Sequence, residues 1–437
     1  MKGYKTSVLS VLLVVMSCIL VCALPAYCAD TTYTNVKDYG AVGDGIADDT
    51  AEIIAAITAA NNRAKSEVIP GVSTIVSYAT VYFPSGKYKI SSALDIGLAN
   101  MMGEGTAIIW QSNPNADIIT QNTVYRRTIS KLSFLGGQNQ IYLNNGNVNS
   151  THIQIEKCHF YCAGSAAIRT GTDLKSTQLV IKDCVFIAAL QVLINYCDKT
   201  SMENCWITTS PDMQDMAVIE NYDVLHVENL LGVPLVNLAY NQRWIDNKST
   251  AQNLTMEKCR FGGEGGGFPA VYNYASYDYT YPVNPTTITF QDCTIYCAAG
   301  HSTPCALYLN EIPSQIKMSG CSGMSDVPAM RVNPSINLNS YFDALHGPPD
   351  FFRSVSYSLD KTNIDHYYTA DGLELPEQMK PFSPDPIDGT AVPTTGWWRV
   401  GQFIRNRNCN GGTTPFGWIC TAAGKPGTWK QVKVTFQ

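Results

Sequence analysis

The chain has 437 residues, of which only 15% are charged, and its formal net charge is −6. This length allows a large buried core, and 33 glycines with few charges suit a protein made of strands, turns and loops. The acidic balance and the lack of a basic run exclude a protein that tracks a nucleic-acid backbone.

Residues 1–28 have the pattern of a signal peptide. Lys2 and Lys5 precede an uncharged apolar run at 8–23, and small side chains follow up to Cys28, where we expect cleavage. The alternative is a retained membrane anchor, but the run is shorter than the ~20 apolar residues that a span needs. We therefore expect a secreted or periplasmic protein that has no membrane contact after cleavage.

The stretch NVKDYGAVGDGIADDTAEIIAAI, at 35–57, predicts a short strand at 36–40, tight glycine turns and then a helix. Asp49 is predicted to cap this helix, with Glu52 three residues later completing a capping box. The predicted apolar face of the helix consists of Ile53, Ile54 and Ile57.

The stretch ATVYFPSGKYKI, at 79–90, predicts two strands joined by a Pro-Ser-Gly turn, and MMGEGTAIIW, at 101–110, predicts the next strand. A DYGAVGDG…DDT phrase followed by VYFPSGKY resembles the start of pectate-lyase-superfamily proteins. That superfamily includes polysaccharide lyases and hydrolases, rhamnogalacturonase-like enzymes and phage tailspikes. The resemblance implies an all-β fold, a right-handed single-stranded parallel β-helix, and a structural role for Asp44, Asp48 and Asp49.

One phrase recurs seven times in the middle of the chain: apolar and variable residues alternate, and a polar residue then precedes a small or apolar one. The phrases end at Cys158, Cys184, Cys205, Leu230, Cys259, Cys293 and Cys321, and a weaker copy ends at Leu132. Intervals of 21 to 34 residues between short strand phrases predict a solenoid, in which each turn of chain stacks on the next. We expect the β-helix to occupy 29–335 and the predicted helix to cap its open end.

The cysteines of this repeat are predicted to form one interior file of mostly free thiols, because three in successive turns cannot all pair. Cys409 and Cys420 flank a glycine-rich loop and are the better candidates for a disulfide. A zinc site is an alternative for the two C-x3-C pairs, but neither has a second pair of ligands nearby. We predict no cofactor and no metal site, and leave open that calcium takes part.

After each phrase the chain offers a second strand, and these strands are predicted to share one face. The predicted inward residues are Ile168, Leu193, Val218, Val236, Val271, Leu307 and Met330. The predicted outward residues follow directly and are Arg169, Ile194, Ile219, Asn237, Tyr272, Tyr308 and Arg331. Two residues further on, the same face is predicted to carry Gly171, Tyr196, Asn221, Ala239, Tyr274, Asn310 and Asn333.

An anionic sugar chain is recognised by aromatic rings, amides and arginines, which are the residue types of this face. The predicted substrate-binding residues are Tyr196, Asn221, Tyr272, Tyr274, Tyr308, Asn310 and Arg331. The predicted catalytic residues are Glu220, Asp223, Glu264 and Arg169, since cleavage needs two carboxyl groups or a base beside a uronate. Glu220 is placed in the inward column, where burial would raise the pKa of its carboxyl. The alternative is an ordinary polar face of a solenoid.

Residues 336–390 are predicted to be a linker and packing segment, and 391–437 a small β module. The tryptophans of this module could form either a sugar platform or a small core.

The whole pattern indicates an exported polysaccharide-active protein that cleaves a uronate-containing glycan by hydrolysis or β-elimination. The alternative is a non-catalytic glycan-binding or adhesive β-helix, similar to a tailspike. The expected partner is a polysaccharide, and both a monomer and a homotrimer remain open.

Overall fold

The structure, a computed structural model, describes residues 33–63, 65–69, 73–77, 79–121, 127–144, 152–172, 178–210, 216–233, 243–261, 271–274, 287–295, 307–311, 315–319, 321–323, 330–332, 357–358, 387–394, 401, 403–409, 414–422 and 427–433.

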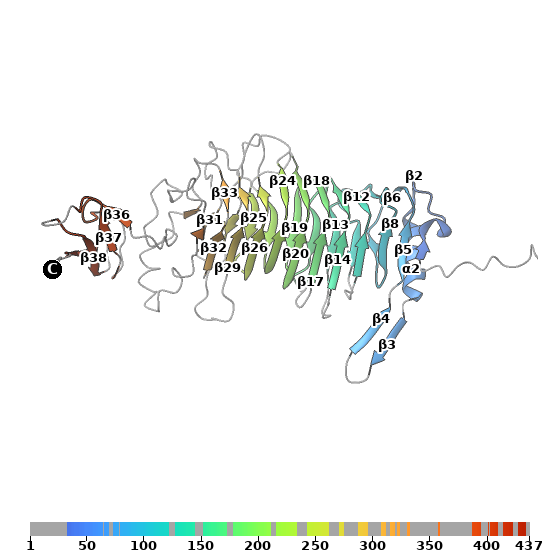
Figure 1. The fold of residues 1–437 in the computed structure, drawn as a ribbon. Coiled ribbons are helices and arrows are strands. Elements are labelled where there is room, and N and C mark those ends of the chain that lie inside the picture. Colours follow the sequence, from blue (N-terminus) through green and yellow to red (C-terminus); the bar gives the residue numbers. More distant parts are fainter. Residues whose placement is uncertain are drawn as a thin grey trace, which may run out of the picture.

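Three parallel sheets stack their strands along one axis, and each turn of the chain contributes one strand to each sheet (Figure 1). The twelve-stranded sheet consists of β1 (Tyr33–Asn35), β5 (Thr80–Phe83), β8 (Asn100–Gly103), β11 (Arg127–Ser130), β14 (His152–Glu156), β17 (Gln178–Lys182), β20 (Lys199–Glu203), β23 (Val224–Glu228), β26 (Asn253–Glu257), β29 (Thr287–Gln291), β32 (Gln315–Ser319) and β35 (Tyr357–Ser358).

The eleven-stranded sheet consists of β2 (Asp44–Asp48), β6 (Gly86–Ile90), β9 (Ala107–Gln111), β12 (Ser133–Gly136), β15 (His159–Tyr161), β18 (Val185–Ala189), β21 (Trp206–Thr209), β24 (Leu231–Val233), β27 (Arg260–Phe261), β30 (Thr294–Ile295) and β33 (Ser322–Gly323). The ten-stranded sheet consists of β7 (Leu94–Asp95), β10 (Ile119–Gln121), β13 (Asn139–Leu143), β16 (Ala166–Thr170), β19 (Gln191–Asn195), β22 (Ala217–Asn221), β25 (Arg243–Asn247), β28 (Val271–Asn273), β31 (Leu307–Leu309) and β34 (Met330–Val332). The predicted fold class, a parallel β-helix, is confirmed.

The amino-terminal helix α2 (Thr50–Arg63) lies at the blue end of the stack in Figure 1, against β1, β5 and β7. It buries Ile53 and Ile57 on the first strands, whereas Ile54 is 42% exposed. The helix therefore covers the open end of the core, as predicted. A hairpin of β3 (Lys65–Ile69) and β4 (Ser73–Ser77) projects from the same end.

Two local predictions for this end are wrong. Residues 36–39 form the 3-10 helix η1 (Val36–Tyr39), and the strand is β1 just before it. The predicted capping box is absent, because the Asp49 carboxylate accepts hydrogen bonds from the backbone N–H groups of Val42 and Gly43, at 2.6 and 3.1 Å. The Thr50 N–H donates to the Asp48 carboxylate at 3.1 Å instead. These contacts support the predicted structural role of the acidic cluster.

The predicted cysteine file lies in the interior. Cys158, Cys184, Cys205, Cys259, Cys293 and Cys321 are all buried and free. In the first five, the thiol lies near the carbonyl two residues earlier and donates to it at 3.2–3.3 Å. The predicted disulfide between Cys409 and Cys420 is wrong, because both thiols are free.

The carboxy-terminal module is a four-stranded sheet that consists of β36 (Ile387–Gly389), β37 (Phe403–Asn406), β38 (Gly417–Ala422) and β39 (Thr428–Val432). Its core holds Ile404, Trp418 and Cys420, with Trp429 packed against them, which favours a core role over a sugar platform for these tryptophans. Both strands β35 and β36 fall within 336–390, so the predicted linker contains parts of the β-helix and of this module. Across the described residues, helices long and apolar enough for a bilayer span are absent.

Candidate functional site

The outer face of the ten-stranded sheet carries two aligned columns of side chains. Strand register gives the first column the order Thr120, Tyr142, Arg169, Ile194, Glu220, Asp246, Tyr272, Tyr308 and Arg331. Backbone hydrogen bonds between turns give the second column, two residues further on, the order Asn144, Gly171, Tyr196, Tyr222, Lys248, Tyr274 and Asn310.

The predicted register of this sheet is wrong by one residue at β22. Ile219 points inward and is 1% exposed, in register with Leu193 and Ile245, while Glu220 lies in the outer column. The next strand is β25, and the predicted strand at 235–239 lies outside the described residues. The outer face consequently gains four residues that the prediction missed: Tyr222, Arg243, Asp246 and Lys248.

A ladder of buried asparagines fixes this register. Asn195, Asn221, Asn247 and Asn273 are all 0% exposed, and each side-chain amide donates to the carbonyl oxygen of the next at 2.9 Å. A buried amide must satisfy its hydrogen bonds, so these residues hold successive turns in phase. The prediction that Asn221 binds substrate is therefore wrong, because its side chain lies inside the β-helix.

Next to this ladder, four charged side chains form a connected group that we call the charge quartet: Glu220, Arg243, Asp246 and Lys248. The Lys248 ammonium lies 3.0 Å from Glu220 Oε1 and 3.1 Å from Asp246 Oδ2, between the two carboxylates. The Arg243 guanidinium binds both oxygens of Asp246 and donates from Nη2 to Oδ2 at 2.8 Å. Two positive and two negative charges thus cancel within the group.

Burial explains why the charges of the quartet are paired with one another. The Asp246 side chain is 0% exposed, and an unpaired buried carboxylate would be strongly unfavourable. Burial alone would lower the pKa of Lys248 and of Arg243, but the nearby Asp246, together with Glu220 in the case of Lys248, outweighs burial and raises both pKa values. Both cations therefore stay charged. The Glu220 side chain is 21% exposed and is the accessible carboxylate of the pair.

Tyrosines border the quartet on both sides. Tyr196 and Tyr222 stack with ring centroids 4.0 Å apart, and the Tyr222 hydroxyl donates to Glu220 Oε2 at 3.1 Å. Burial, its contact with Tyr196 and the charge of Glu220 raise the pKa of Tyr222 far above its usual range, so this phenol keeps its proton. The Lys248 ammonium lies 5.9 Å from the Tyr222 ring centroid and 5.8 Å from that of Tyr274.

On the far side of the quartet, Tyr272 and Tyr308 meet edge to face at 4.6 Å, with Tyr274 packed beside them. The Arg243 guanidinium lies 5.1 Å from the Tyr272 ring centroid. Tyr272 and Tyr308 are only 9% and 8% exposed, so these two rings pack within the protein and do not support the predicted role in stacking on a substrate. The partly exposed rings of Tyr196, Tyr222 and Tyr274 are the ones suited to a sugar ring, which offers an apolar face and polar edges.

The remaining predicted residues lie further away. Arg169 shares the outer column but is separated from Glu220 by Ile194. Asp223 lies in the turn after β22, where its carbonyl accepts backbone hydrogen bonds from Gln252 and Asn253. Asn310 ends the second column. Arg331 is placed only by its backbone, in register with Tyr308, and Glu264 lies outside the described residues.

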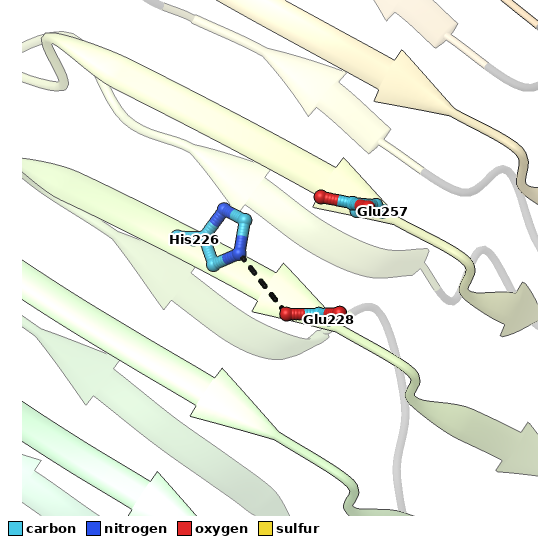
Figure 2. A group of neighbouring side chains, drawn as sticks. All are labelled: His226, Glu228 and Glu257. Atoms are coloured by element: carbon cyan, nitrogen blue, oxygen red, sulfur yellow. Dashed lines mark ion pairs between the residues drawn. The ribbon is translucent and has the colours of Figure 1, made fainter.

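A second charged cluster lies on the twelve-stranded sheet (Figure 2). The ligand atoms of His226, Glu228 and Glu257 lie within 4.8 Å of one another. The Lys258 ammonium already pairs with both carboxylates, at 3.3 Å from Glu228 Oε1 and 2.7 Å from Glu257 Oε1, and offsets one of their two negative charges. We therefore assign no metal to this partly exposed cluster.

The chain is similar to a known protein family and, over short stretches, to individual proteins. Residues 33–264 match the model of the family described as "Rhamnogalacturonase A/epimerase, pectate lyase-like". A stretch of 63 residues is 43% identical to the mannuronan C5-epimerase AlgE4 of Azotobacter vinelandii, and one of 62 residues is 48% identical to the non-secreted LysM effector LysM19 of Penicillium expansum. Each match covers 14% of this chain, and they cover 9% and 5% of the respective relatives.

Two solved structures are similar in fold. The A-module of A. vinelandii AlgE4 has a TM-score of 0.34 at 17% identity, over 69% of this chain and 91% of that one. The catalytic unit of a GH87 α-1,3-glucanase from Streptomyces thermodiastaticus has a TM-score of 0.38 at 12% identity, over 71% and 66%. The family match covers more than half of the sequence, from β1 to just beyond β27, so this chain belongs to the rhamnogalacturonase A/epimerase, pectate lyase-like family.

Proposed function

We propose that the chain is an exported enzyme that cleaves a uronate-containing polysaccharide by β-elimination on the outer face of its ten-stranded sheet. Membership of a pectate lyase-like family supports a polysaccharide substrate. The partly exposed rings of Tyr222 and Tyr274, beside Lys248, supply stacking surfaces for a sugar chain. Lys248 supplies a cation for the negative charge of such a chain. Export is the prediction made above from residues 1–28.

The position of Lys248 is the observation that favours elimination over hydrolysis. A glycoside hydrolase places the glycosidic bond, and in some cases a water, between its two carboxyl groups. Here the Lys248 ammonium fills the space between Glu220 and Asp246, at 3.0 and 3.1 Å. A cation beside a carboxylate base is instead the arrangement that removal of a proton next to a uronate carboxylate requires, because negative charge develops there.

Each group then has one role. The Glu220 carboxylate removes the proton from the carbon that bears the uronate carboxylate, and Lys248 stabilises the developing charge. The electron pair of the broken C–H bond forms a carbon–carbon double bond as the bond to the glycosidic oxygen breaks. The Tyr222 hydroxyl supplies its proton to the departing oxygen. The proton that Glu220 has taken up then passes to the Tyr222 oxygen along the 3.1 Å contact between the two groups, which restores both for the next turnover. The products are an unsaturated sugar end and a new reducing end.

The test is incubation with polygalacturonate and with alginate, following ultraviolet absorbance for unsaturated ends and a colour assay for reducing ends. We expect both signals to rise together on at least one polymer. Glu220→Gln should lower kcat by about a hundredfold or more, the usual contribution of a general base. Glu203→Gln changes a half-buried outward glutamate of another sheet and should leave kcat unchanged.

Reducing ends without absorbance would establish hydrolysis and exclude elimination. If neither signal appears while the polymer still binds, the chain is a glycan-binding β-helix and the enzymatic proposal is wrong.

A further inference from the structure

Arg169 stands apart from the other cations on the face of the proposed site. It lies in the outer column of the ten-stranded sheet, with Ile194 between it and Glu220. Adjacent strands are about 4.8 Å apart, so two spacings place Arg169 about 10 Å from Glu220 along the β-helix axis. This separation is about the length of a disaccharide, so Arg169 does not reach the sugar unit that contacts Glu220.

The charge of Arg169 is not neutralised by any ion pair in the described part of the chain, whereas Arg243 and Lys248 are both paired. Its Nε atom is buried and has no hydrogen-bond partner among the described residues. A buried donor without an acceptor is unfavourable, so this side chain is not satisfied within the described part of the protein. The Nη groups of the same half-buried side chain also have no hydrogen-bond partner among the described residues, and they are the donors that a ligand on this face would meet.

The surroundings of Arg169 hold its guanidinium in place. The guanidinium carbon lies 5.5 Å from the centroid of the Tyr142 ring on the adjacent strand, which is a cation–π contact. Two residues further on, Gly171 has no side chain, and the Asn144 amide oxygen lies only 2.7 Å from where a Cβ would be. The arginine is thus supported by a ring on one side and bordered by an amide and a bare backbone on another.

A planar guanidinium with free N–H donors matches a carboxylate, which can accept two parallel hydrogen bonds. We propose that Arg169 binds the carboxylate of the uronate located one disaccharide away from the unit that reacts at Glu220. This inference rests on the proposed function in one respect, namely that Glu220 marks the reacting unit. It implies that the polymer runs along the β-helix axis, across the strands, from the charge quartet to Arg169.

Binding can be measured without turnover in a chain that carries Glu220→Gln. The probes are polygalacturonate and its methyl ester, which has the same backbone without the negative charge, and titration calorimetry gives the affinities. In this background, Arg169→Gln should weaken binding of polygalacturonate by about tenfold to one-hundredfold, the effect of one hydrogen-bonded charge. It should change binding of the ester little.

The matched control is Arg260→Gln, which removes the same charge from an exposed position of the eleven-stranded sheet. It should leave both affinities unchanged. Equal effects of the two substitutions, or equal weakening of the acid and the ester by Arg169→Gln, would overturn the proposal. A chain that does not bind polygalacturonate at all would overturn it as well.

Kinetics then separate this inference from the proposed function. With an otherwise unaltered chain and galacturonate oligomers of increasing length, Arg169→Gln should raise KM for long oligomers and leave kcat unchanged. For the shortest cleaved oligomer, neither constant should change. If the polymer binds through Arg169 but no unsaturated ends form, elimination is wrong while the binding role stands.

Discussion

At the residue scale, one backbone angle explains the polar residue before each cysteine of the repeat. The residue just before the file position has a positive φ between 50° and 55° in seven successive turns, at Lys131, Lys157, Asp183, Asn204, Asn229, Lys258 and Asp292. This left-handed conformation crowds the Cβ atom of most residues, and Asn and Asp tolerate it best. Lysine is therefore less favourable at this position than the Asn or Asp that other turns have there.

We expect Lys157→Asn to stabilise the protein by about 0.5–1 kcal/mol, because Asn accepts this conformation at lower cost. Lys157 is exposed and precedes Cys158, and the column next to it already pairs Asp183 with Asn204 at 3.2 Å. Chemical denaturation measures the change. Lys199→Asn, at an exposed strand position, is the control and should give no gain. A gain at Lys199 equal to that at Lys157 would contradict the explanation.

Asp246 is predicted to be a positioning residue rather than a reacting one, because it is fully buried and holds both Arg243 and Lys248. Asp246→Asn leaves two partly buried cations without their shared counter-charge, so the free energy of unfolding should fall by about 3 kcal/mol, the lower end of the cost of breaking a buried pair. Glu203→Gln breaks a more exposed pair with Lys182 and should cost less than about 1 kcal/mol. Similar losses in the two variants would show that the quartet contributes no more than a surface ion pair.

At the scale of the elements, the asparagine ladder holds four neighbouring strands of the ten-stranded sheet in phase. Asn221→Ala removes the acceptor of Asn195 and the donor to Asn247, and leaves a small cavity. We expect a loss of about 2–4 kcal/mol in the free energy of unfolding, measured by denaturation.

Asn115→Ala is the control, since Asn115 is exposed in a turn and has no positive φ, and it should change stability by about 0.5 kcal/mol or less. The folded fraction of Asn221→Ala should bind polygalacturonate as the unaltered chain does. Weaker binding at an unchanged fold would mean that this side chain contacts the glycan after all.

The fold could be predicted from the sequence because each turn repeats a local phrase with alternating apolar residues. The register of β22 could not be predicted from that alternation, because Val218, Ile219 and the residue before them are all apolar and permit either phase. The alternation of apolar residues also does not predict strand β25, since its sequence, RWIDN, carries a pair of opposite charges whose compensation exists only after folding.

A repeat in the sequence could have corrected both errors. The tripeptides INY, ENY, DNK and YNY begin at Ile194, Glu220, Asp246 and Tyr272, and successive copies are 26 residues apart. The central Asn of each is the ladder residue, so its two neighbours must point outward. This signal, read before the apolar alternation, identifies Tyr222, Asp246 and Lys248 as members of the outer face.

At the scale of the whole molecule, stability depends on contacts between neighbouring turns, because a stack of repeats has no contacts between distant ones. The first turn has a neighbour on one side only, and helix α2 covers its other side with Ile53 and Ile57. Loss of contact at this helix should therefore increase local opening most in the adjacent strands, and the increase should become smaller with distance along the stack.

We expect Ile53→Ala to lower the free energy of unfolding by about 2–4 kcal/mol, as for other truncations of fully buried side chains. Hydrogen exchange followed by mass spectrometry should find faster exchange in β1 and β5, and unchanged exchange in β22, because local opening stays near the altered end. Ile54→Ala makes the same deletion on the exposed side of the helix and should leave exchange unchanged. Equal acceleration in β1 and β22 would mean that the β-helix opens as a single cooperative unit, and the cap would then protect the charge quartet as much as the first turn.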